Sequence, residues 1–84
     1  MGRVVCATAG RDKDKYFAIV GIVDEQYVLI ADGVYRKLSH PKRKKIKHLS
    51  FRPQVLQSIA DKLQQDKKVF DAELKSALTS AQQG

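Results

Sequence analysis

Residues 16–31 read YFAIVGIVDEQYVLIA, two apolar runs separated by an acidic pair. The runs, residues 16–23 and 26–31, are rich in β-branched and aromatic side chains, which favour strands. Asp24-Glu25 leaves a gap that suits a tight hairpin. Gly21 interrupts the first run and fits either the sharp bend of a barrel corner or an ordinary β-bulge. We therefore expect two consecutive antiparallel strands here.

Three further short strands are expected around this pair. Residues 3–8 form a β-branched apolar run, residues 34–38 alternate apolar and polar side chains, and residues 46–49 form a last short segment. Asp32-Gly33 indicates a type I′ hairpin turn, because both residues tolerate positive φ. Five short strands with tight connections predict a small β-barrel over residues 1–50.

Residues 51–84 are expected to form a helical extension packed on the barrel. Pro53 suits the first turn of a helix, where its missing N–H costs nothing. A second helix is expected from Asp71 as N-cap, with Glu73 in its first turn and Phe70 packed at its entrance. Helical spacing gives each helix one apolar face. The faces are Val55, Leu56, Ile59, Ala60 and Leu63, then Leu74, Ala77, Leu78 and Ala81. A partner-binding helix is the alternative use of such a face. The fold class is thus mainly β with C-terminal α, in one compact domain.

Composition argues against an enzyme. A chain of 84 residues has little room for an enclosed active site beside its core. No phosphate-binding glycine loop or nucleophile motif is present, and His40 and His48 lack partners at metal-ligand spacing. We expect no cofactor and no metal. Five carboxylates fall in predicted turns, where they suit turn geometry: Asp12, Asp14, Asp24, Glu25 and Asp32.

The expected compartment is the cytoplasm. Cys6 is the only cysteine and lies in an apolar run, so we expect it to be buried as a small hydrophobe. One cysteine forms no internal disulfide, which is typical of a reducing compartment. The chain also shows no secretory signal pattern and no apolar run long enough for a membrane span.

Positive charge is concentrated in one segment. Sixteen Lys and Arg against nine Asp and Glu give a net charge of +7. Residues 36–47 hold seven of the basic residues and no acid, so nine residues of each sign remain elsewhere. Many charge runs are merely solvated surface, but charge gathered in one place is typical of an anion-binding face.

Residues 2–13, GRVVCATAGRDK, and the apolar strand through Ile22 resemble a KOW motif. Gly10 matches the glycine of that motif, and Arg11-Asp12-Lys13 matches its basic loop. Many KOW loops carry a second glycine at the position of Asp14. Over residues 2–49 the chain is similar to small bacterial KOW-domain RNA-binding proteins and to KOW-containing large-subunit ribosomal proteins of archaea and eukaryotes. The resemblance implies a Src-homology-3-like barrel that binds RNA, in particular ribosomal RNA.

We therefore expect a non-catalytic, ribosome-associated RNA-binding protein that acts in translation and is a monomer when free. The expected RNA-binding residues are Arg11, Lys13, Lys15, Arg36, Lys37, Lys42, Arg43, Lys44, Lys45, Lys47 and His48. Gly10, Asp32 and Gly33 are expected to form turns, and Tyr35 offers a stacking surface. Two alternatives stay open: a KOW barrel that binds ribosomal or transcription proteins, and non-specific DNA binding.

Overall fold

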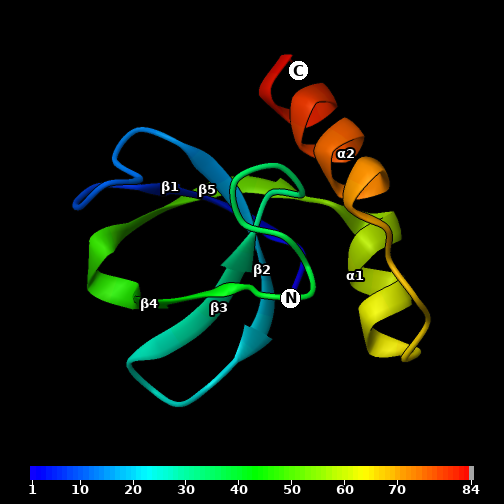
Figure 1. Cartoon of the computed structure of the whole chain (residues 1–84), viewed down its shortest axis with the longest axis horizontal. Helices are drawn as coiled ribbons and strands as arrows, with labels where there is room; N and C mark the ends of the chain where they lie inside the picture. The colour runs from blue at the N-terminus through cyan, green and yellow to red at the C-terminus, as the bar shows by residue number, and fades with distance from the viewer. Residues whose placement is uncertain (84) are drawn as a thin grey trace.

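The computed structural model describes residues 1–83, which form one antiparallel sheet followed by two helices (Figure 1). The strands lie side by side in the order β4-β3-β2-β1-β5. The elements are β1 (Arg3–Ala7), β2 (Tyr16–Ile22), β3 (Tyr27–Ala31), β4 (Lys42–Lys45), the 3₁₀ helix η1 (Ile46–His48), β5 (Leu49–Val55), α1 (Gln57–Gln64) and α2 (Asp71–Gln83). The predicted mainly β class with five strands and two following helices is confirmed.

The sheet is open, so the predicted closed barrel is wrong. β4 and β5 are its two edges and do not pair with each other. η1 lies between these two strands in the chain, which passes from one edge of the sheet to the other. The sheet nevertheless gathers apolar side chains from β1, β2, β3 and β5 into one cluster, which Ile46 of η1 covers in part.

Two of the five predicted strands are placed wrongly. Residues 34–38 form a loop, because Asp32 Oδ1 accepts the N–H groups of Val34 (2.9 Å) and Arg36 (2.8 Å) and bends the backbone. Gly33 has a φ of 82°, whereas Asp32 has no positive φ, so the predicted type I′ turn is also wrong. Residues 46–48, expected to begin a strand, form η1.

The basic run itself supplies the edge strand. Lys42–Lys45 pair antiparallel with β3, in a register that runs from Ile30↔Lys42 to Tyr27↔Lys45. Long lysine side chains can lay their methylene groups over an apolar neighbour while the ammonium stays in water. Lysines at a sheet edge also discourage pairing with other chains. A highly charged sequence is therefore compatible with an edge strand, although the hydrophobic periodicity of the sequence does not predict a strand at residues 42–45.

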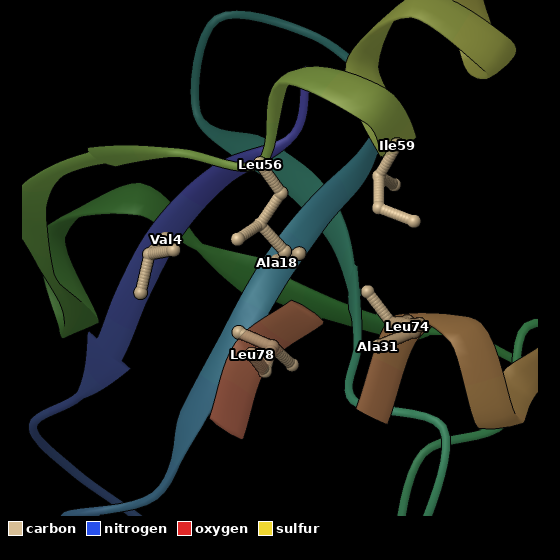
Figure 2. Packing of buried hydrophobic residues seen from close by; sticks show 7 residues of the cluster. All are labelled: Val4, Ala18, Ala31, Leu56, Ile59, Leu74 and Leu78. Carbon is tan, nitrogen blue, oxygen red and sulfur yellow. The ribbon is translucent and has the colours of Figure 1, made fainter. Parts of the chain in front are cut away.

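The sheet has two apolar faces, and β1 contributes to both. Val4 faces the helices and Val5 faces the opposite cluster, because successive strand residues point to opposite sides. The cluster beneath the helices, shown in Figure 2, joins the sheet to both helices. Its buried members are Val4, Ala18, Ala31, Leu56, Ile59, Leu74 and Leu78. The second cluster comprises Val5, Ala7, Phe17, Ile19, Val28, Ile30 and Leu49.

The first helix begins later than predicted. β5 continues to Val55, so the expected boundary between residues 50 and 51 falls inside a strand, and Pro53 lies in β5 instead of in a helix. An edge strand tolerates proline because its missing N–H is not needed for pairing. Val55 is 46% exposed and lies outside the helical face. Leu56 and Ile59 are buried under the sheet as expected.

The second helix begins at Asp71, and Leu74 and Leu78 are buried, as predicted. Asp71 does not cap its own helix, because its Oδ1 accepts the N–H of Leu38 (2.8 Å) and ties the preceding loop to α2. Glu73 takes the capping role by accepting the N–H of Phe70 (3.3 Å). Phe70 is 59% exposed, so its predicted packing at the helix entrance is wrong.

Two smaller expectations concern the environments of Gly21 and Cys6. The pairing of β2 with β3 shifts register between Ile19 and Gly21, which favours the β-bulge among the two alternatives for this glycine. A Cβ on Gly21 would lie 3.0 Å from a methyl carbon of Leu29. Cys6 is half-buried rather than fully buried. It sits between Tyr16 and Ser50 on the neighbouring strands.

Gly33 and Gly10 allow a matched test of backbone geometry. Both have positive φ, but a Cβ on Gly33 would overlap the carbonyl oxygen of Asp71, whereas one on Gly10 meets only the flexible end of Lys44. We expect Gly33→Ala to lower the free energy of unfolding by about 2–5 kcal/mol and Gly10→Ala by about 1–2 kcal/mol. Urea denaturation measures both, and a larger loss for Gly10→Ala would contradict this packing.

The contact between the helices is expected to depend on pH. The Lys62 ammonium and then the Phe70 N–H donate to the Glu73 carboxylate and hold its pKa below the ordinary value of 4.5. Because the pKa of Glu73 is lower in the folded protein than in the unfolded chain, the contact stabilises the fold at pH values above the unfolded-state pKa. This stabilisation is lost as the pH falls through the folded-state pKa. Glu73→Gln should therefore lower the melting temperature at neutral pH and have a shrinking effect below pH 4.5. A constant difference across this range would contradict the assignment.

Candidate nucleic-acid interface

β4 presents its cations on two faces of the sheet. Side chains directly across an antiparallel pair point to the same side. Lys42 and Lys44 therefore share the side of their β3 partners Ile30 and Val28, while Arg43 and Lys45 lie on the opposite side. Positive charge thus surrounds this edge of the sheet rather than covering a single face.

Tyr27 sits among the cations of β4. The Arg43 guanidinium carbon lies 4.3 Å from the centre of the Tyr27 ring, and Lys45 Nζ lies 5.8 Å from it. Both distances are within the range of cation–π attraction. The half-buried ring holds Arg43 over the sheet, which lowers the entropy that this side chain would lose on binding an anion. Sequence reasoning missed Tyr27, because only the register places it opposite the basic strand.

The β1–β2 loop, residues 8–15, lies beside β4 and η1. Lys44 Nζ donates to the Ala9 carbonyl at 2.9 Å, and the Thr8 N–H donates to the His48 carbonyl at 2.9 Å. Arg11 and Lys13 are exposed on this loop. The fold therefore brings the two basic segments of the sequence together.

The backbone of the β1–β2 loop has a defined shape. The Lys13 N–H donates to the Gly10 carbonyl (3.2 Å), and the Asp14 N–H donates to the Ala7 carbonyl (2.8 Å). Gly10 and Asp14 both have positive φ, 83° and 70°. Aspartate is one of the few side chains that tolerate this region. Asp14 thus adopts a backbone conformation that glycine takes without steric cost.

Arg36 is held by a buried acid. Its guanidinium donates to Asp12 Oδ2 at 2.9 Å and 3.3 Å, and Asp12 is only 4% exposed. This ion pair joins the β1–β2 loop to the loop after β3. Arg36 was predicted to bind RNA, but the structure gives it this second role. No local pattern indicates the pair, because its residues lie 24 positions apart.

Tyr35 and Lys15 form an exposed pair next to this bridge. Tyr35 is 66% exposed, and Lys15 Nζ lies 3.9 Å from the centre of its ring. Tyr35 was expected on a strand but lies in the loop after β3. An exposed ring with a cation on one face leaves the rest of its surface accessible to a base or another flat group.

The remaining predicted residues differ in how freely they face solvent. Among the predicted RNA-binding residues, six exposed cations make no side-chain hydrogen bond or ion pair within the described residues: Arg11, Lys13, Lys37, Lys42, Arg43 and Lys47. His48 is half-buried in η1. The freely exposed cations are available to phosphates without breaking a contact, whereas Arg36 and Lys44 also hold the loops in place.

A cavity of about 460 Å³ that is widely open to solvent adjoins the basic strand. It lies between the turn that links β2 to β3 and the start of η1. Its lining residues are Glu25, Gln26, Lys45, Ile46 and Lys47.

The described residues contain no group of His, Cys, Asp and Glu side chains placed to hold a metal ion. Neither helix in this part of the chain has the length and apolar character of a membrane span. No protein-family model matches the chain.

The dual role of Arg36 is testable against its neighbour Lys37. Arg36→Gln leaves the buried Asp12 carboxylate without its ion partner and should lower the free energy of unfolding by about 1–3 kcal/mol. Lys37→Gln, at an exposed and unpaired position, should change it by less than about 0.5 kcal/mol. Chemical denaturation measures both. Adding Asp12→Asn to Arg36→Gln should recover part of the loss, and simple additivity of the two changes would contradict the pairing.

Proposed function

We propose that this protein is a non-catalytic RNA-binding module of the KOW type with a Src-homology-3-like arrangement of strands. One observation carries the proposal: the Lys44–Ala9 hydrogen bond joins the basic strand β4 to the basic β1–β2 loop. Two segments far apart in the sequence thereby form one positive surface. We call this surface, made of residues 11–15 and 42–47, the basic surface.

The chemistry of the basic surface fits a phosphate backbone. Lysines contribute charge and release counterions from nucleic acid, which gives affinity with little sequence preference. Arg11 and Arg43 add planar groups that bind phosphate through two hydrogen bonds or stack on bases. The helical extension carries nearly balanced charge, so it offers no comparable attraction.

Aromatic side chains beside the cations favour RNA with unpaired nucleotides over duplex DNA. Proteins recognise single-stranded RNA largely by stacking its bases on aromatic rings and arginine planes. The exposed Tyr35 ring beside Lys15 supplies such a stacking surface. The half-buried Tyr27 ring holds the plane of Arg43, which is itself exposed, next to it. Ribosomal RNA in the cytoplasm is the proposed target, and this part of the proposal rests on the resemblance to KOW-domain ribosomal proteins.

Protein binding is the second candidate function. Phe51 and Val55 lie exposed on β5, the edge of the sheet opposite β4, and Arg3 packs over the Phe51 ring at 5.6 Å. A free edge with apolar side chains suits a protein partner. This surface is separate from the basic surface, so both kinds of partner are compatible with the fold.

Charge replacement tests the RNA proposal. Lys42, Arg43 and Lys47 are exposed, and replacing all three with Gln removes three cations from the basic surface. If each contacts a phosphate of single-stranded RNA, the slope of log K against log salt should flatten by about 0.7 per contact, about 2 in total. Filter-binding titrations over a range of salt concentrations measure the slope.

The matched control replaces Lys67, Lys68 and Lys75, which are exposed on or near α2. It removes the same charge from the other end of the molecule. We expect a much smaller change in slope for the control. Equal changes in the two variants would mean that only net charge matters, and the basic surface would then be abandoned as a site.

A further inference from the structure

Hydrogen bonds of the fold fix the walls of the cavity beside β4. The Ile46 N–H donates to the Gln26 carbonyl at 2.8 Å and joins its two walls, the β2–β3 turn and η1. Asp24 Oδ1 accepts the N–H groups of Gln26 (2.8 Å) and Tyr27 (2.9 Å) and fixes the turn. Backbone hydrogen bonds and an Asx turn therefore hold the cavity open before any ligand binds, which reduces the entropy lost on binding.

The size and lining of the cavity suit one nucleotide. A volume of about 460 Å³ lies within the range of small-ligand sites. Ile46 and the methylene groups of its neighbours provide apolar contact for a base. Lys45 and Lys47 supply positive charge for a phosphate, and Glu25 and Gln26 supply hydrogen-bonding groups for a base edge. Both halves of a nucleotide thus find matching chemistry.

Lys45 connects the cavity to the basic surface. It is the last residue of β4 and also lines the cavity. An RNA backbone that follows β4 therefore stays close to cations all the way to the cavity. A paired base is stacked inside its helix and does not enter a protein cavity, whereas a bulged base turns outward freely.

We propose that this cavity receives one unpaired nucleotide of the bound RNA, with its phosphate at Lys45 and Lys47 and its base edge at Glu25 and Gln26. The inference rests on the RNA-binding function proposed above and adds a preference for bulged or looped RNA. The Glu25 carboxylate accepts hydrogen bonds and donates none. An exocyclic amino group can donate to it, whereas the single N3–H of uracil lies between two carbonyl oxygens that repel a carboxylate, so bases with an exocyclic amino group are favoured over uracil.

The test compares two RNA duplexes that differ by one bulged adenosine. Fluorescence anisotropy with the full chain at one fixed salt concentration gives the ratio of the two affinities. We expect the bulged duplex to bind about tenfold more tightly, the contribution of roughly one net hydrogen bond to a charged group. A bulged uridine should bind more weakly than the bulged adenosine.

The cavity variant is Glu25→Ala with Gln26→Ala. Both side chains are exposed, and the hydrogen bonds that hold the turn use the backbone of Gln26, so the cavity walls should remain. Loss of an acid should raise the affinity for both duplexes, and the ratio of affinities cancels this effect. The matched control is Gln57→Ala with Asp61→Ala on α1, which also removes one glutamine and one acid. We expect the ratio to fall near one in the cavity variant and to stay near ten in the control.

Each other outcome has a distinct meaning. Equal binding of both duplexes by the unaltered protein would overturn the cavity proposal and leave RNA binding intact. No binding of either duplex would overturn the proposed function as well. A ratio that stays near ten in the cavity variant would place base recognition elsewhere, such as at Tyr35, and would also overturn the cavity proposal.

A 2-aminopurine at the bulge gives a readout that needs no variant. Its fluorescence should change when protein saturates the RNA, because the base exchanges its surroundings for the cavity. The same base at a paired position should not respond. A bulge signal that saturating protein leaves unchanged would contradict entry of the base into the cavity.

Discussion

The structure depends on one constraint: a single sheet with apolar side chains on both faces must be covered on both sides. Val4 and Val5 show the problem at adjacent positions, because one faces the helices and the other faces the opposite cluster. On one face, side chains from the strands themselves pack around Phe17 and Ile30. Leu56, Ile59, Leu74 and Leu78 cover the other. A chain this small buries a limited share of its surface, and using both faces of the sheet enlarges its core.

This arrangement explains why so much charge gathers at one edge. The apolar residues of β1, β2 and β3 supply most of the two clusters, so β4, which pairs with β3, can carry cations on both of its sides. Lysines there protect the edge from pairing with other chains and at the same time form an anion-binding surface. Stability and the proposed function therefore place similar demands on residues 42–45.

The candidate site is composite, and two polar contacts assemble it. The Arg36–Asp12 pair and the Lys44–Ala9 hydrogen bond hold the β1–β2 loop against the loop after β3 and against β4. Some cations thus order the surface, while others remain exposed on it. The basic surface attracts phosphates in general, and the cavity at Lys45 is proposed to add the selection of one base.

The sequence alone determined the mainly β class, the central strand pair and the buried faces of both helices, because strand propensity and helical periodicity are local signals. It also located the excess charge and the left-handed turn at Gly10. Only the tertiary structure decided that the sheet stays open, that Lys42–Lys45 form its edge and that Arg36 pairs with Asp12. These features depend on contacts between residues far apart in the chain, and a side chain such as Asp32 overrides local propensity by bonding the backbone.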